Sequence, residues 1–483
     1  MRYNLVTRIL GKIIILVGFA LIIPVILALY FQEKEWKAFA YSTVIALAIG
    51  FPLSRWPYNN GEIRRREGYA IVALSWAAAS IFGCLPYLFA GTFTNFADAL
   101  FETVSGFTTT GASVMTDIEI HARSILFWRS LTQWLGGMGI VVLFVALLSQ
   151  LGVGGLHMLQ AEAPGPVTEK LKPRIQETAK ILWLTYVILS AAEALLLWLT
   201  GMPLYEAVVH TFSTMATGGF SSKNASIGHY ESPLIHWIII IFMFLAGANF
   251  ALYYQALRQK NPLYFWRNPE FRLYTLITLG ATITIALDLF IRGYYRGENL
   301  IRQAAFQVTS ILTTTGFATA DFDTWPSFSR LLLLVLMFVG GCYGSTGGSI
   351  KVGRHLVLLK NGMVELFRAV HPHAVLPVRL GNAVVVKETL ILNILQFIGL
   401  YLLIFALSTL LLVSLTGLDM ESAASAVAAT LGNVGPGLGV VGPTQNYAHL
   451  PAAAKYLLSW LMLVGRLEIY TVLVLFLRAT WKR

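Results

Sequence analysis

Long apolar segments separated by short polar ones run through the whole 483-residue chain. A helix needs roughly 20 apolar residues to cross the hydrocarbon core of a bilayer, and the sequence holds about ten such segments. The first two, residues 8–31 and 37–54, are joined by a short polar turn and precede the basic stretch 64–66. The pattern predicts an all-α membrane protein that begins with a pair of spanning helices.

Four short interruptions of the apolar pattern resemble one another and are rich in threonine and glycine. They are Thr108-Thr109-Thr110-Gly111-Ala112, Ala216-Thr217-Gly218-Gly219-Phe220, Thr313-Thr314-Thr315-Gly316-Phe317 and Gly432-Asn433-Val434-Gly435-Pro436. A cation that sheds its water needs replacement oxygens, and rings of backbone carbonyls supply them in channels. Glycine reaches the positive φ values that turn successive carbonyls toward one axis. One copy alone is typical of an ordinary turn, whereas four copies indicate a pore for a monovalent cation.

The four interruptions keep a common register with their surroundings. Their glycines, Gly111, Gly219, Gly316 and Gly435, are separated by 108, 97 and 119 residues. An alanine lies 12 residues upstream of each, at Ala99, Ala207, Ala304 and Ala423. These alanines stand in segments of about 12 to 15 residues, which are too short to span a bilayer and are tolerated there only inside protein or beside water. Each downstream segment carries a further glycine that would let helices pack closely.

We therefore predict a pseudo-fourfold pore built from four units, each a helix, a re-entrant pore loop and a second long helix. The expected divisions are 1–67 for the N-terminal helix pair, then 68–160, 161–262, 263–380 and 381–483 for the four pore units. The ion would meet mainly backbone carbonyls of Thr109, Thr110, Gly111, Thr217, Gly218, Gly219, Thr314, Thr315, Gly316, Asn433, Val434 and Gly435.

The second helix of the third unit is interrupted by residues 340–349, which include five glycines. Each glycine in a helix interior costs about 1 kcal/mol relative to alanine, so this stretch is not expected to stay helical. Irregular backbone at membrane depth should line a cavity. The hypothesis is a movable loop below the filter, formed by Gly344, Ser345, Thr346, Gly347 and Gly348, that gates conduction. The alternative is a passive kink.

Arg466 lies about midway along the last apolar segment, between Lys455 and Arg478. A mid-membrane arginine is costly and usually faces a polar interior. In the register of the four units it replaces Met138, Ala248 and Cys342. We expect one positive charge near the pore axis that hinders cations and contacts the glycine-rich stretch. A buried pair with Glu468, or with carbonyls, is the alternative.

Composition and charge support a membrane protein. The chain is 56% hydrophobic and 12% charged, with a mean hydropathy of +0.67, whereas soluble domains are about 25% charged. The net charge of +11 does not indicate nucleic acid, because most basic residues fall in alternate connections and in the tails. They include Arg55, Arg64, Arg65, Arg66, Lys170, Lys172, Arg174, Lys351, Arg354, Lys360, Lys482 and Arg483. Basic loops face the cytoplasm, so both termini are expected there.

These motifs resemble those of the Trk/Ktr/HKT superfamily of cation transporters, in particular its TrkH/TrkG branch. The resemblance rests on the four interruptions, on 344–348 and on Gly465-Arg466-Leu467-Glu468, and it covers the whole chain. It implies potassium uptake across a bacterial inner membrane, with K⁺ as the transported ion and no bound cofactor. It also implies a homodimer and a cytosolic nucleotide-binding regulatory protein of the TrkA type. The basic linker 360–387 is a candidate docking surface.

Two questions stay open at this point. A secondary transporter that couples potassium to sodium or protons is the alternative function, although such proteins use inverted repeats and intramembrane carboxylates. No catalytic constellation is found, so an enzyme is not expected.

Asp98 and Glu206 share one register in the first two pore segments. They either attract cations at an outer mouth or cap helices.

Overall fold

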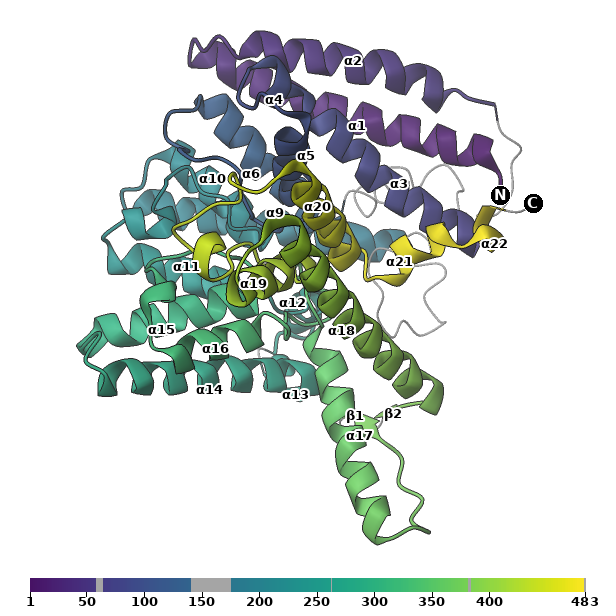
Figure 1. Cartoon of the computed structure of the whole chain (residues 1–483), viewed down its shortest axis with the longest axis vertical. Helices are drawn as coiled ribbons and strands as arrows, with labels where there is room; N and C mark the ends of the chain where they lie inside the picture. The colour runs from purple at the N-terminus through teal and green to yellow at the C-terminus, as the bar shows by residue number, and fades with distance from the viewer. Residues whose placement is uncertain (58–63, 140–174, 262, 381–383, 482–483) are drawn as a thin grey trace.

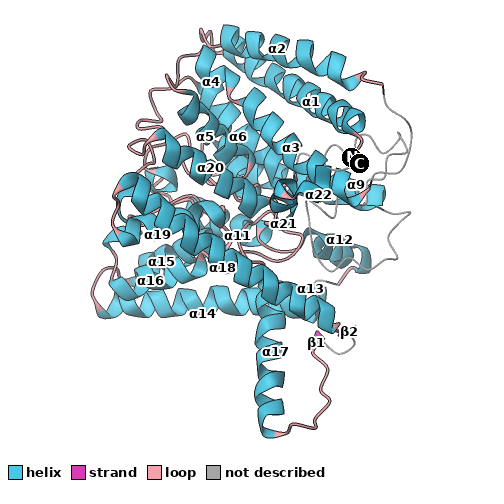
Figure 2. Ribbon diagram, turned by 45° about the vertical axis from the view of Figure 1, so that its right-hand side comes forward, coloured by secondary structure: helices cyan, strands magenta, loops and turns pink. Residues whose placement is uncertain are grey.

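The computed structural model describes residues 1–57, 64–139, 175–261, 263–380 and 384–481, and these residues are overwhelmingly helical (Figures 1 and 2). The longer helices are α1 (Tyr3–Tyr30), α2 (Trp36–Ser54), α3 (Arg65–Gly83), α5 (Phe96–Phe107), α6 (Arg123–Gly137), α9 (Ile175–Leu199), α10 (Leu204–Met215), α11 (Pro233–Ala246), α12 (Phe250–Gln259), α14 (Pro269–Ile291), α15 (Gly297–Leu312), α16 (Ser327–Leu336), α17 (Val352–Val370), α18 (Glu388–Thr416), α19 (Met420–Leu431) and α20 (Ala452–Arg466). The short ones are α4 (Leu85–Phe89), α13 (Tyr264–Arg267), α21 (Tyr470–Leu473) and α22 (Arg478–Trp481). Strands β1 (Arg379–Leu380) and β2 (Val384–Val385) form an antiparallel pair.

The helices that are candidates to cross a membrane are identified by their length and apolar composition. Among the described residues, 6 helices are long and apolar enough to cross a membrane, or 8 if two bent pairs each count as one span. The expected N-terminal pair is confirmed as α1 and α2, which pack closely because Gly11 leaves no room for a side chain beside Leu53 and Ser54. The expected total of about ten stays a prediction, since α6 ends near residues 140–174, which lie outside the described part. Lys170, Lys172, Arg174 and the 160/161 boundary fall in that same range.

Four short helices occupy the segments predicted to be re-entrant. They are α5, α10, α15 and α19, with 12, 12, 16 and 12 residues. The register alanine of each is fully buried. Helix α10 packs on α6 of the preceding unit, α15 on α11, and α5 on α20 of the last unit. The second helix of the first, second and fourth units therefore packs against the pore helix of the next unit.

The expectation of four second helices, of which only the third is broken, was wrong. Helices α11 and α12 meet at 92°, and α20 is bent by 115° from the segment Tyr470–Phe476. Arg466 is thus the last residue of α20 rather than its middle, because Glu468 and Ile469 take left-handed φ values of 53° and 54°. The break in the third unit is confirmed, since the chain is irregular between Leu336 and Val352.

Helix α17 leaves the main body and projects away from it beside α18, with β1 and β2 near the base of the projection (Figures 1 and 2). The beginning of α1 and the end of α22 lie close together on another edge (Figure 1). There Tyr3 stacks on Trp481, with ring centroids 6.3 Å apart, and Arg2 pairs with the buried carboxylate of Glu67 at 2.7 Å. The two termini are therefore on one side of the molecule.

Candidate functional site

Each of the four short helices ends in the same turn. The residue after the helix cap has a left-handed φ of 54° to 60°, and the next N–H donates to a carbonyl five residues back at 2.7 to 2.9 Å. The left-handed residues are Thr109, Thr217, Thr314 and Asn433. Such a turn satisfies the last helix carbonyls, but glycine normally occupies that position. A β-branched residue there is unusual, and no local pattern beyond the common spacing predicts it.

A second left-handed residue follows two positions later, and here it is the expected glycine, with φ between 75° and 106° at Gly111, Gly219, Gly316 and Gly435. A methyl group added to Gly111 would collide with the carbonyl oxygen of Gly218. The same holds for Gly219 against Thr315, for Gly316 against Val434, and for Gly435 against Thr110. Each glycine thus lies against the next stretch, and the fourth lies against the first.

One cavity of about 140 Å³ is lined by all four of these glycines. Its wall continues through the residues that follow them, including Ser113, Ser221 and Tyr447. Such a cavity places backbone oxygens and small polar side chains around one space. Of the twelve residues expected to meet the ion, these four glycines line the cavity, and the other eight stand beside them in the same four turns.

Side chains from neighbouring elements hold these turns in place. The Gln133 amide donates to the carbonyl of Gly218 at 2.6 Å and accepts from the N–H of Phe220 at 3.1 Å. The Asn433 amide donates to the hydroxyl of Thr110 at 3.0 Å, which joins the fourth turn to the first. The side chains of Gln133, Thr110 and Asn433 are fully buried. Buried polar groups need such partners.

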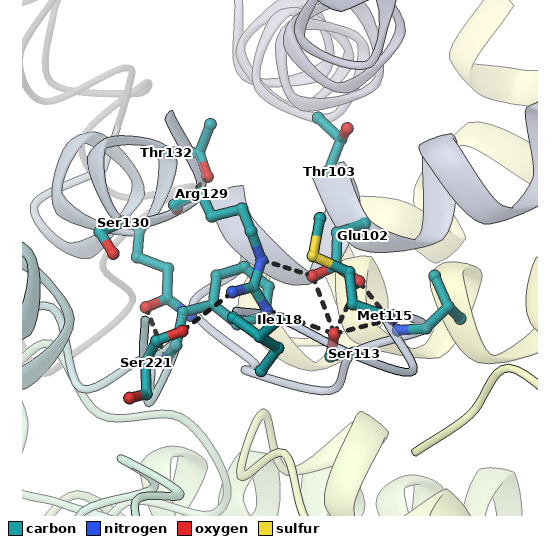
Figure 3. Close-up of polar contacts among 12 residues, drawn as sticks. Glu102, Thr103, Ser113, Met115, Ile118, Arg129, Ser130, Thr132 and Ser221 are labelled. Atoms are coloured by element: carbon teal, nitrogen blue, oxygen red, sulfur yellow. Dashed lines mark hydrogen bonds and ion pairs between the residues drawn. The ribbon is translucent and has the colours of Figure 1, made fainter. Parts of the chain in front are cut away.

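A buried ion pair behind the first two turns was missed in the sequence (Figure 3). The Nε of Arg129 lies 2.8 Å from a carboxylate oxygen of Glu102, and the side chains are 1% and 0% exposed. Arg129 also donates to the carbonyl of Ser221 at 3.1 Å and to the hydroxyl of Ser113 at 3.2 Å. The sequence signal for this pair was the presence of two opposite charges, Glu102 and Arg129, in the apolar segments before and after the first turn, because charged residues inside a membrane usually pair.

The glycine-rich stretch lies directly against the four turns. The Thr346 hydroxyl donates to the carbonyl of Met215 at 3.1 Å, at the end of α10. The N–H of Gly348 donates to the hydroxyl of Thr314 at 2.7 Å, and a methyl group on Gly348 would collide with the carbonyl of Gly432. The stretch therefore touches the second, third and fourth units at once.

Arg466 connects this stretch to the first unit. One guanidinium nitrogen donates to the carbonyl of Thr346 at 2.6 Å, and the other donates to the carbonyls of Gly136 and Gly137 at 2.7 and 2.8 Å. Glu468, considered as a partner of Arg466, forms an ion pair with Arg354 at the start of α17. The expected contact between Arg466 and the glycine-rich stretch is present, and its partners are the carbonyls that the alternative also named; a role in hindering cations stays a prediction.

Glu270, at the start of α14, binds both the glycine-rich stretch and the first turn of α17. One carboxylate oxygen accepts the N–H of Tyr343 at 2.7 Å and the N–H of Gly353 at 2.9 Å. Lys351, which is buried, donates to the carbonyl of Gly347. The stretch is thus held by a network of charged groups, none of which the sequence reasoning assigned to it.

Asp98 and Glu206 lie in the first turns of α5 and α10. Asp98 pairs with Lys455 at 2.5 Å, and Glu206 pairs with Lys223 at 3.1 Å. Both carboxylates are therefore balanced by a lysine rather than left to attract cations alone.

Comparison with known proteins places the chain in a family. Residues 35–482 match the model of the family TrkH, described as a cation transport protein. The chain is 44% identical to the Trk system potassium uptake protein TrkH of Salmonella typhimurium, with 100% of both chains covered, and 35% identical to the TrkG protein of Escherichia coli, with 99% of both covered. The crystal structure of the potassium transporter TrkH from Vibrio parahaemolyticus superimposes with a TM-score of 0.90, at 38% identity and with 100% of both chains covered. The chain therefore belongs to the TrkH family of cation transport proteins.

Proposed function

We propose that this protein takes up potassium through a channel-like filter formed by the four turns around Gly111, Gly219, Gly316 and Gly435. The observation that carries the proposal is the closed cycle in which each glycine lies against the carbonyl of the neighbouring turn. Carbonyl oxygens so gathered can replace the hydration shell of a cation. The choice of potassium rests on the relatives, which are named potassium uptake proteins.

The filter assignment is tested by Gly111→Ser. The substitution adds a side chain where a methyl group already meets the carbonyl of Gly218, at a φ of 81°. We expect the potassium-to-sodium permeability ratio to fall. Gly201→Ser is the matched control, because Gly201 has a φ of 92° and no atom within 4 Å of an added methyl group. An unchanged ratio in Gly111→Ser, with the protein folded, contradicts the proposal.

We propose that the glycine-rich stretch is a gate and that Arg466 holds it closed. The support is its position: Gly348 and Thr346 bond to the turns of two units, while Arg466 joins Thr346 to the end of α6. Conduction would require this stretch to leave the turns. The hydrogen bonds that attach it include several to charged groups, so opening requires a ligand or partner that binds the released conformation more tightly than the closed one.

We further propose a homodimer in a bacterial inner membrane, regulated by a cytosolic nucleotide-binding protein of the TrkA type. Helix α17 begins where the gate ends, and its projecting part carries exposed Leu359, Met363, Leu366 and Val370. A partner bound there could pull on the gate. The proposed cytoplasmic location of both termini is supported by their position on one side of the molecule. Crosslinking of a cysteine placed at Met363, with and without purified regulator, tests which partner covers this helix.

A further inference from the structure

The Glu102–Arg129 ion pair joins the outer ends of two neighbouring turns (Figure 3). Ser113 stands two residues after Gly111, and Ser221 stands two residues after Gly219. Glu102 accepts the N–H of Val114 at 2.9 Å and the hydroxyl of Ser113 at 3.0 Å, so it holds the first turn. Arg129 holds the second turn through the Ser221 carbonyl. The ion pair is therefore a side-chain bridge between these two turns.

The pair is also enclosed on the side of the second unit. The guanidinium of Arg129 lies over the ring of Phe220 at 4.1 Å, and Phe220 directly follows Gly219. The hydroxyl of Ser221 lies 2.9 Å from Nε2 of His210, which is fully buried in α10. An arginine offers a rigid fork of donors, so the two turns cannot separate without breaking several charge-assisted hydrogen bonds.

The other two turns have neutral supports within their own units, and one charged contact joins these units, where the N–H of Gly439 donates to the carboxylate of Asp323 at 3.2 Å. In the third, the Ser310 hydroxyl donates to the carbonyl of Phe317 at 2.6 Å. In the fourth, the N–H of Leu438 donates to the hydroxyl of Ser425 at 2.8 Å. Both contacts stay within one unit. The charged pair is thus the support that ties one unit to the next at the outer end of the first two turns.

We infer that Glu102 and Arg129 are positioning residues that determine ion selectivity, because they fix the spacing of the first two turns. The inference rests on the proposed function of these turns as the filter. A filter distinguishes potassium from sodium through the size of its cavity or the number and field of its carbonyls. Either property changes when Gly111 and Gly219 are allowed to move apart. Neither side chain needs to touch the ion.

The test compares permeability ratios of purified variants from zero-current potentials with potassium on one side and sodium on the other. Glu102→Gln keeps the size of the side chain but leaves Arg129 without its counter-charge, and Arg129→Lys keeps the charge but cannot bridge to Ser221. We expect the potassium-to-sodium ratio to fall at least about tenfold in each, the effect of losing one charge-assisted hydrogen bond. Glu67→Gln is the matched control, because Glu67 is equally buried and paired with Arg2 far from the cavity.

A milder variant covers the case in which these proteins fail to fold. Ser113→Ala removes only the hydroxyl that lies between the two charges, and we expect a decrease of about threefold. Folded variants with the wild-type ratio overturn the inference. Gly111→Ser, measured alongside, separates the two claims: if it lowers the ratio while the pair variants do not, only the positioning role is wrong. If Gly111→Ser also has no effect, the filter assignment itself fails.

Discussion

Replacing Arg466 with alanine should open the pore, because this side chain is the link between the glycine-rich stretch and the end of α6. The substitution removes the hydrogen bond to Thr346 and the two to Gly136 and Gly137. Only the bond to Thr346 acts on the gate itself. A hydrogen bond from a charged donor contributes roughly 1.5–3 kcal/mol. Its loss shifts the balance between closed and open states by roughly tenfold to 150-fold.

Arg466→Lys distinguishes the effect of the hydrogen-bonded link from the effect of the positive charge. Lysine retains the positive charge near the axis but is a single point donor that cannot hold carbonyls of two units together. A gate closed by the link predicts a flux between those of wild type and Arg466→Ala. A purely electrostatic barrier predicts wild-type flux for the lysine variant.

The assay is the initial rate of rubidium or potassium uptake into vesicles that contain the purified variant without any regulator. Arg292→Ala serves as the control, since Arg292 is 57% exposed and pairs with Asp288, four residues earlier, at the end of α14. Equal initial rates for wild type and Arg466→Ala, at equal protein content, would refute the proposed role of Arg466 in closing the gate.

Three further outcomes are expected. Gly348→Ala should raise unregulated uptake, because the new methyl group collides with the carbonyl of Gly432 and displaces the gate. Gly362→Ala is the control and should leave uptake unchanged, because its methyl group meets no atom within 4 Å. Equal uptake rates for Gly348→Ala and wild type would count against the gate. Asp419→Ala should lower the melting temperature at neutral pH by removing an N-cap worth about 1 kcal/mol. Hydrogen bonds from Ser422 lower the pKa of Asp419, so wild type should lose this advantage as the pH falls through the acidic range below about 4. A difference in melting temperature that persists at that pH would contradict the capping role. The zero-current potential should follow the potassium gradient alone, and a shift on changing sodium or pH would favour coupled transport.

The sequence was sufficient to predict the pore elements because each carries a local signal. Apolar length located the spanning helices, and the glycine register located the four turns. It was insufficient where tertiary contacts decide the backbone. Nothing local marks Thr109 or Thr314 as left-handed, and the end of α20 at Arg466 depends on the conformations of Glu468 and Ile469.

Only the part of the candidate site that carries a local signal could be predicted from the sequence. Arg466 was noticed because its charge stands alone in an apolar segment, and its contact with the glycine-rich stretch followed from register. Glu102 and Arg129 are 27 residues apart in sequence, and their partners Ser113 and Ser221 belong to different units. Glu102, Ser113 and Arg129 lie in the first unit and Ser221 lies in the second, so the contact of Arg129 with Ser221 depends on the packing of two units, which no pattern within one unit could reveal.

Whether the four turns surround one ion can be measured by anomalous diffraction from crystals of this protein soaked in rubidium. We expect an anomalous peak on the axis between Gly111, Gly219, Gly316 and Gly435, within coordination distance of carbonyls from all four turns. Rubidium bound elsewhere, with no peak among these glycines, would contradict this expectation.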